Sequence, residues 1–291
     1  MTSFSLCAPA KLNLFLRLTG KRRDGYNNII TVFHRISLCD VLTFSPSRSG
    51  IIITCDHLAV PCNHTNLIHK AYELLRKRCG FRKGVRVHLK KNIPLEAGLG
   101  GASSDAATAL RGFNRLFKLG LSQWDLYELG SLLGADVPFF LTSYQTALGI
   151  ERGDKVIRLG TKKTKLYFVL FVFKKGLKTQ KVYQKFTYKG GQISLTNIIS
   201  KVIMLPLSLN RKDVNAIERI SYNDLLRPAG IIKPHIVRLI KQLKHKGFSA
   251  SQMTGSGSTV YTIINNRKEA RELARQFADE EEFSTMIVQS Y

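Results

Sequence analysis

The sequence predicts an α+β fold divided into two domains. Segments typical of strands and segments typical of helices are mixed along its 291 residues without a regular strand–helix alternation, which argues against a purely parallel α/β sheet. At roughly 150 residues per domain, this length suggests about two domains. A polar stretch with two glycines at 149–160 provides a boundary, so we expect domains over residues 1–155 and 156–291.

The first domain is predicted to begin with a strand at 8–18, because leucines alternate on one of its faces. The patterns after it predict a basic turn, three strands, a helix and a further strand, at 21–25, 29–38, 41–44, 51–55, 66–78 and 85–89. Cys39 and Asp40 separate the second of these strands from the third. Two amphipathic helices follow at 103–116 and 122–133, the second with Ser122 as its N-cap.

The second domain is predicted to contain fewer clear elements. The apolar run at 166–173 indicates a buried strand. Periodic apolar residues predict a helical region at 227–246, with Pro234 near a helix start. A strand at 259–264 and a final helix at 267–277 complete the expected elements.

Charge is the most unusual property of the composition. The 45 Lys and Arg residues exceed the 20 Asp and Glu residues and give a formal net charge of +25. A field of this sign attracts polyanions, such as nucleic acid or phosphate-rich small molecules. The basic clusters lack the interleaved aromatic residues that stack on bases. We therefore expect no nucleic-acid partner, with a basic nucleic-acid-binding protein as a remote alternative.

Several features predict a cytoplasmic protein without a membrane partner. The longest apolar run, 167–173, is too short to span a bilayer. The first residues lack the basic and apolar regions of a secretory signal. The five cysteines include no C-x-x-C pair, so we expect reduced thiols rather than a disulfide framework. We expect these thiols to be small apolar residues of the core.

A glycine-rich segment carries the strongest signal for chemistry. Gly98, Gly100 and Gly101 lie between a predicted strand and a predicted helix that begins near Ser103. Glycines allow a backbone to approach a ligand closely, and a helix N-terminus offers free N–H groups with a positive dipole end. The segment therefore predicts a phosphate site. It lacks the Gly-Lys-Ser/Thr ending of a P-loop and is no clean G-x-G-x-x-G.

Three weaker signals accompany the glycine-rich segment. Lys11 and Asn13 interrupt an apolar strand, where they either face solvent or need buried partners. Asp136 lies between a helix and an apolar run, and could be a base, a metal ligand or an Asx turn before a proline. A second glycine-serine turn contains Gly255 and Gly257.

Together and in this order, these segments resemble the GHMP kinase superfamily. The resemblance covers about residues 8–264 and is carried by Pro9-Ala-Lys11-Leu-Asn13, Arg23-Asp-Gly-Tyr26, Gly98-Leu-Gly-Gly-Ala-Ser-Ser-Asp-Ala-Ala107, Gly134-Ala-Asp136-Val-Pro138, Tyr222-Asn-Asp-Leu225 and Gly255-Ser-Gly257. It implies a two-domain GHMP-kinase-like fold with the active site in the cleft between the domains. The Ser-Ser-Asp form of the central loop is similar to the branch that phosphorylates the 2-hydroxyl of an erythritol carried on cytidine diphosphate, in the non-mevalonate isoprenoid pathway.

The resemblance also implies roles for individual residues. Asp136 matches the catalytic aspartate that accepts the hydroxyl proton, and Lys11 matches the catalytic lysine that neutralises charge on the transferred phosphoryl group. ATP is the implied cofactor with Mg²⁺, for which we predict no metal-ligating residues. The residues implied to bind ATP are Asn66, Leu67, Pro94, Gly98, Leu99, Gly100, Gly101, Ala102, Ser103 and Ser104.

The implied acceptor is a small molecule, bound by a monomer or weak homodimer. The residues implied to bind it are Asn13, Tyr26, Asn27, Thr179, Tyr183, Gly255 and Gly257. Three departures from the family pattern occur: Asn27 replaces the usual His, Ala102 replaces the usual Gly, and Lys174 and Lys175 stand in place of the usual Pro before Lys178. The alternative is another GHMP kinase that acts on a homoserine-type or mevalonate-type alcohol, which would need no aromatic partners for a base.

Overall fold

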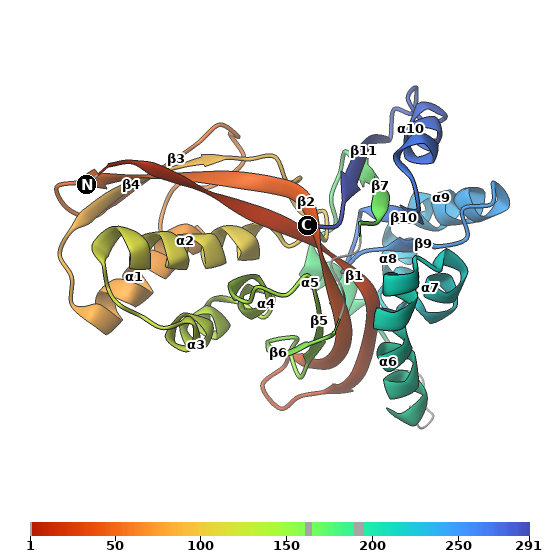
Figure 1. Cartoon of the computed structure of the whole chain (residues 1–291), viewed down its shortest axis with the longest axis horizontal. Helices are drawn as coiled ribbons and strands as arrows, with labels where there is room; N and C mark the ends of the chain where they lie inside the picture. The colour runs from red at the N-terminus through yellow and green to blue at the C-terminus, as the bar shows by residue number, and fades with distance from the viewer. Residues whose placement is uncertain (1, 161–164, 189–194) are drawn as a thin grey trace. The chain divides into compact units, whose positions relative to one another are not determined.

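The computed structural model describes residues 2–160, 165–188 and 195–291, and the chain forms two compact units (Figure 1). Each unit is assembled from several segments of the chain. Unit 1 contains Met1–Ala10, Leu38–Ile93 and Gly100–Ser143, and unit 2 contains Lys11–Ser37, Pro94–Leu99 and Tyr144–Tyr291. The domain boundary expected at residue 155 stays a prediction.

Two long strands contribute to both units. The strand β1 (Phe4–Lys21) passes from unit 1 to unit 2 after Ala10, and β2 (Asn27–Ser47) passes back after Ser37. The predicted leucine face of β1 is buried, but so is nearly all of the opposite face between residues 8 and 16. The strand is therefore buried on both sides. Of the two alternatives for Lys11 and Asn13, exposure to solvent is excluded and both residues have buried partners.

The strand β2 is continuous, although the sequence predicted two strands separated at Cys39 and Asp40. Asp40 is fully buried within the strand. One of its carboxylate oxygens accepts the backbone N–H groups of Asn92 and Ile93, at 2.6 and 2.7 Å, and the other accepts the ammonium group of Lys91. Because these donors satisfy the carboxylate, a charged residue does not interrupt the strand.

Unit 1 combines a sheet with four helices. The strand β4 (Gly84–Lys90) pairs antiparallel with β2 and parallel with β3 (Ile51–Cys55). The helices α1 (Leu67–Cys79) and α2 (Gly101–Phe117) lie side by side along this sheet (Figure 1), with α3 (Gln123–Leu133) and α4 (Val137–Leu141) beside them. The elements predicted at 51–55, 66–78, 85–89, 103–116 and 122–133 are confirmed to within two residues, and Ser122 caps α3 as expected. The short helix α4 was not predicted.

The contact between α2 and β2 is unusually close at Gly112. A Cβ atom at this position would lie 2.2 Å from Cζ of Phe44, whose buried ring also packs edge-on against Phe113. We expect Gly112→Ala to lower the free energy of unfolding by about 1–3 kcal/mol through overpacking, despite the higher helix propensity of Ala. Urea unfolding measures this loss, and Gly20→Ala, with open space around it, is the control. An unchanged midpoint for Gly112→Ala would contradict the close packing.

Unit 2 contains a four-stranded antiparallel sheet in the order β11-β7-β10-β9. Its strands are β7 (Tyr167–Phe173), β9 (Ser251–Met253), β10 (Val260–Ile264) and β11 (Phe283–Gln289). The predicted strands at 166–173 and 259–264 are confirmed as β7 and β10. The short strands β9 and β11 were not predicted.

The other elements of unit 2 are mostly short. A Lys233–Pro234 step divides the predicted helical region 227–246 into two helices, because proline cannot continue a preceding helix. Residues 267–275 form the predicted last helix. The elements are β5 (Thr146–Ile150), β6 (Lys155–Arg158), α5 (Thr179–Gln184), α6 (Leu195–Arg211), α7 (Val214–Ile220), β8 (Tyr222–Asn223), α8 (Leu226–Ile232), α9 (Pro234–His245) and α10 (Arg267–Arg275).

Two expectations concern membrane spans and cysteines. Over the three described ranges, no helix has both the length and the apolar composition needed to cross a bilayer. The expectation of buried cysteines is wrong. Cys7 and Cys62 are exposed and Cys39, Cys55 and Cys79 are half-buried, all five as free thiols.

Candidate active site

Lys11 is held in a buried position on β1 in unit 2. Its side chain extends over the ring of Phe33, with Nζ 5.9 Å from the ring centre, and the residue is 3% exposed. Its ammonium group donates to Oδ1 of Asn13 at 2.6 Å and to the carbonyl oxygen of Gly98 at 3.0 Å. Its backbone N–H donates to the carbonyl oxygen of Leu99. Neutral hydrogen-bond acceptors therefore hold the ammonium group in place, and it does not lie on a solvent-exposed face of the strand.

Three further hydrogen bonds, two made by Asn13 and one by its partner Thr31, fix Asn13 in place. Its Nδ2 donates to Oγ1 of Thr31 at 2.7 Å, and its backbone N–H donates to Oγ1 of Thr254 at 3.0 Å. The hydroxyl of Thr31 donates to the carbonyl oxygen of Phe15 at 2.7 Å. All of these residues are buried or belong to buried strands. Neither threonine was predicted: Thr31 is a lone threonine in a strand with no distinctive spacing, and Thr254 adjoins the second glycine turn but was given no role.

The two glycine turns meet beside this lysine, and both belong to unit 2 at this point. Gly98, Gly255 and Gly257 have φ of +74°, +55° and +83°, a region that favours glycine. A Cβ atom at Gly98 would lie 2.4 Å from the carbonyl oxygen of Thr254, and one at Gly255 would lie 3.3 Å from Nζ of Lys11. The predicted residues Lys11, Asn13, Gly98 and Gly255 are thus brought together.

Asn223 holds the second glycine turn from outside. Its Nδ2 donates to the carbonyl oxygens of Met253 and Gly255, at 2.8 and 2.9 Å, and its Oδ1 accepts the backbone N–H of Leu225. The residue lies on β8, which pairs parallel with β1. The Tyr-Asn-Asp-Leu motif at 222–225 signalled this position, but sequence reasoning gave it no role.

Two of the residues expected to bind the acceptor, Tyr26 and Asn27, lie at the turn between β1 and β2. The ring of Tyr26 is 56% exposed, and the guanidinium of Arg152 lies 5.3 Å from its centre. Oδ1 of Asn27 accepts a hydrogen bond from the hydroxyl of Tyr188 at 2.7 Å. An exposed ring stacked by a cation is suited to a planar base. Arg152 and Tyr188 were not predicted.

Two further predicted residues belong to α5. Oγ1 of Thr179 and Oγ of Ser256 are 2.9 Å apart, which places Thr179 against the second glycine turn. Tyr183 is half-buried and packs against the hydrophobic core of unit 2. The structure therefore brings Thr179 close to Gly255 and Gly257, whereas Tyr183 has a packing role as well as any contact with a ligand.

The N-terminus of α2, in unit 1, has the features of an anion site. Gly100 precedes the helix with φ +74°, no side chain caps the helix, and its first turn contains no acidic residue. The backbone N–H groups of residues 101–103 can therefore face an anion, whereas that of Ser104 donates to the carbonyl oxygen of Gly100 at 2.9 Å. Oγ of Ser104 donates to the carbonyl oxygen of Pro9 at 2.7 Å. Ala102 is exposed on the helix and needs no positive φ, so the usual Gly is not required there.

A buried charge network lies directly under this turn. The ammonium of Lys91 contacts the carboxylate of Asp40 and lies 3.2 Å from Oδ2 of Asp105. A Cβ atom at Gly101 would lie 2.9 Å from the same Nζ. Burial raises the pKa of Asp105 from its ordinary 3.8 to about 8, because it disfavours the charged carboxylate; the neighbouring Asp40 also raises this pKa, and Lys91 opposes the shift. These residues are far apart in the sequence, so no motif predicted the network.

The raised pKa of Asp105 makes stability depend on pH. The folded protein holds a proton at Asp105 up to about pH 8, whereas the unfolded chain loses it near 3.8. Its contribution is therefore complete below about pH 4 and is lost as pH rises toward 8. We expect Asp105→Asn, neutral at every pH, to remove this loss. Between pH 5.5 and 8, the free energy of unfolding of the wild type should fall relative to the variant by about 1 kcal/mol or more. Parallel urea-unfolding results at the two pH values would contradict the assignment.

The residues expected to bind adenine lie at the start of α1 in unit 1. Asn66 is the N-cap, since its Oδ1 accepts the backbone N–H of Ile68 at 2.8 Å, and its Nδ2 donates to the carbonyl oxygen of Pro61. Leu67 is half-buried in the first turn, and Pro94 is half-buried in unit 2. The amide of Asn66 is therefore engaged in shaping the loop before α1.

Asp136 occupies the position before α4 in unit 1. Its carboxylate does not cap this helix, and Pro138 follows within the first turn. The backbone N–H of Val137 donates to the carbonyl oxygen of Gly134 at 3.2 Å, which forms a tight turn around the aspartate. The residue is half-buried.

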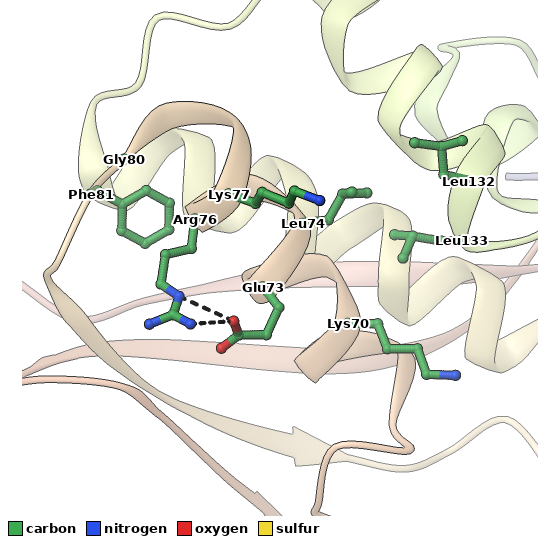
Figure 2. A pocket seen from close by; sticks show the side chains of 9 residues that line it. All are labelled: Lys70, Glu73, Leu74, Arg76, Lys77, Gly80, Phe81, Leu132 and Leu133. Carbon is green, nitrogen blue, oxygen red and sulfur yellow. Dashed lines mark hydrogen bonds and ion pairs between the residues drawn. The ribbon is translucent and has the colours of Figure 1, made fainter.

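A groove of about 720 Å³ lies elsewhere in unit 1, between α1 and α3 (Figure 2). Arg76 and Glu73 form an ion pair along its wall. None of the residues predicted to bind ATP or the acceptor lines it, so it is separate from the candidate site. The lining residues are Lys70, Glu73, Leu74, Arg76, Lys77, Gly80, Phe81, Leu132 and Leu133.

Comparison with known families defines the class of protein. The family model described as the GHMP kinases N terminal domain matches residues 66–144, and the GHMP kinases C terminal model matches residues 207–282. The buried lysine, the glycine turns and the α+β fold agree with this class. These matches make the molecule a GHMP kinase, a phosphotransferase that uses ATP.

Individual relatives narrow the class further. The 4-diphosphocytidyl-2-C-methyl-D-erythritol kinase of Moorella thermoacetica is 37% identical, over 96% of each chain, and that of Syntrophus aciditrophicus is 36% identical, over 92% of each. A crystal structure of 4-(cytidine 5'-diphospho)-2C-methyl-D-erythritol kinase superposes with a TM-score of 0.80 at 28% identity, over 98% of each chain. The homoserine kinase of Cytophaga hutchinsonii, at 17% identity and a TM-score of 0.76, shares the fold. The chain belongs to the 4-diphosphocytidyl-2-C-methyl-D-erythritol kinase family.

Proposed function

We propose that this protein transfers the γ-phosphoryl group of ATP to the 2-hydroxyl of 4-diphosphocytidyl-2-C-methyl-D-erythritol, in the non-mevalonate route to isoprenoid precursors. The observation that carries the proposal is the 37% identity to a kinase of that name over 96% of both chains. Lys11 supports the proposal, because its buried ammonium is held by hydrogen bonds to Asn13 and Gly98. Phosphoryl transfer requires a cation fixed in this way. A homoserine-type or mevalonate-type acceptor is not favoured, since those relatives are far more distant.

The proposed reaction needs one proton acceptor and one fixed cation. The acceptor hydroxyl oxygen forms a bond to the γ-phosphorus while the bond from that phosphorus to the β-bridging oxygen breaks, and ADP leaves. We assign acceptance of the hydroxyl proton to Asp136. We assign to Lys11 the neutralisation of the charge that develops on the transferred group. Asn13 keeps the ammonium in place through its 2.6 Å hydrogen bond.

We propose that the N-terminus of α2 binds the phosphates of ATP. Its uncapped N–H groups and the absence of acidic residues from its first turn favour a polyanion there. Mg²⁺ would neutralise charge on the phosphate oxygens when bound. The described residues contain no group of three or more His, Cys, Asp or Glu side chains placed to hold a metal. We therefore propose that the phosphates supply most of its ligands.

We propose that the cytidine part of the acceptor is recognised around Tyr26 and Asn27. The exposed ring of Tyr26 can stack on the base, and the neighbouring Arg152 can contribute charge to the diphosphate. The side-chain amide of Asn27 can both donate hydrogen bonds to the edge of a cytosine and accept hydrogen bonds from it. The cytoplasmic location, the monomeric or weakly dimeric state and the absence of a nucleic-acid partner stay predictions.

A comparison of acceptors tests this function. We would measure kcat/KM of the purified protein with Mg-ATP and each of three alcohols: 4-diphosphocytidyl-2-C-methyl-D-erythritol, homoserine and mevalonate. The proposal expects turnover with the first at least about a hundredfold above the others, because a site built for a base loses those contacts with a small alcohol. Preferential turnover of homoserine or mevalonate would overturn it.

A further inference from the structure

Thr31 has a hydrogen-bonding arrangement that admits one interpretation. The residue is completely buried on β2, and its hydroxyl has two partners, the carbonyl oxygen of Phe15 and Nδ2 of Asn13, both at 2.7 Å. A carbonyl oxygen can only accept, so the single hydroxyl proton of Thr31 points to Phe15. The oxygen of Thr31 is then available to Asn13 only as an acceptor.

This arrangement determines which way the amide of Asn13 faces. The NH₂ group must point to Thr31, and Oδ1 must point to the ammonium of Lys11, 2.6 Å away. In the opposite orientation, the NH₂ group would face the ammonium and Oδ1 would face the oxygen of Thr31. The contact with Lys11 would then join two hydrogen-bond donors. With the Thr31 proton directed to Phe15, the contact with Thr31 would join two acceptors, at a site where buried polar groups need partners.

We propose that Thr31 is a positioning residue for the phosphoryl transfer. It selects one orientation of the Asn13 amide, and that amide holds the ammonium of Lys11 toward the reacting phosphoryl group. The inference rests on the proposed role of Lys11 in the proposed function. The hydroxyl of Thr31 touches neither substrate in this account and acts only through Asn13.

The substitution Thr31→Val tests this role because it keeps the shape of the side chain and removes the acceptor. We expect kcat to fall about tenfold, the loss of one directed hydrogen bond, while KM for ATP and for the acceptor each stay within about twofold. Thr31→Ser, which keeps the hydroxyl, should restore kcat to within about twofold of the wild type. The matched control is Thr262→Val, since Thr262 is equally buried on β10 and its hydroxyl has no hydrogen-bond partner among the described residues.

A double-mutant cycle separates positioning from a structural role. If Thr31 acts through Asn13, the substitution Thr31→Val should change kcat by less than about twofold in an Asn13→Ala background. If Thr31 supports the strand instead, the same tenfold loss should persist in that background. Persistence of the loss, or an unchanged kcat for Thr31→Val alone, would overturn the proposal.

A spectroscopic measurement distinguishes a failure of this proposal from a failure of the proposed function. The ¹H–¹⁵N signal of the Lys11 ammonium is assigned by its disappearance in Lys11→Met. We expect this signal to shift or broaden in Thr31→Val and to keep its wild-type position in Thr31→Ser and Thr262→Val. A wild-type protein that phosphorylates none of the three alcohols would contradict the function. An unmoved Lys11 signal in Thr31→Val would contradict the role of Thr31.

Discussion

Replacing Lys11 by Met is expected to lower kcat by about 10²–10³-fold, the effect of removing one preorganised donor from an oxyanion-type site. The side chain keeps its length and its packing over Phe33 but loses the ammonium that Asn13 and Gly98 hold. KM for ATP should change little, because the charge acts on the transferred group. Steady-state kinetics with Mg-ATP and 4-diphosphocytidyl-2-C-methyl-D-erythritol measure the loss.

The control for this variant is Lys241→Met. Lys241 is an exposed lysine on α9, so its replacement removes the same charge without touching the site. Both variants lower the net charge of +25 by one. A Lys11→Met enzyme that retained more than about a tenth of the wild-type kcat would contradict the role of Lys11, provided that its melting temperature matches that of the wild type.

Replacing Asp136 by Asn is expected to lower kcat by about 10²–10⁴-fold, the range for loss of a general base. The amide has the same size as the carboxylate but cannot take up the proton of the acceptor hydroxyl. The change removes no capping hydrogen bond from α4, and equal melting temperatures of the variant and the wild type check that unit 1 stays folded. Rapid-quench measurement of the first turnover tests whether the chemical step itself has slowed.

Glu128→Gln on the exposed face of α3 is the matched control for this loss of one carboxylate. It should leave kcat within about twofold. If Asp136→Asn slowed only product release, with a first turnover as fast as in the wild type, Asp136 would not be the proton acceptor.

Local patterns predicted the elements that surround the glycine turns. A strand, three glycines and an amphipathic helix follow one another at 84–117, and each has its own periodicity or backbone requirement. The continuity of β2 could not be predicted, because it depends on three donors that reach Asp40 from residues 91–93. The helix α6 was missed, since it carries Pro206 within its length, which normally indicates a helix end.

The candidate site could be predicted only where its residues form contiguous motifs. Lys11, Asn13 and the glycines belong to such motifs. Asn223 belongs to one too, but its role appears only when folding brings it to the second glycine turn. Thr31 does not stand out, because an isolated Thr acquires meaning only from the partner that folding brings to it. The network of Lys91 with two aspartates likewise joins three distant segments of unit 1. Tertiary hydrogen bonding, and not local propensity, specifies these positions.

Identification of the product by ³¹P NMR tests the proposed phosphoryl transfer most directly. Purified protein would be incubated with Mg-ATP and 4-diphosphocytidyl-2-C-methyl-D-erythritol until the reaction stops. We expect one new phosphomonoester resonance on the erythritol for each ADP formed, with the cytidine diphosphate resonances retained. We expect no such resonance with Lys11→Met over the same time. Release of inorganic phosphate without a new phosphomonoester, or equal product from Lys11→Met, would contradict the account.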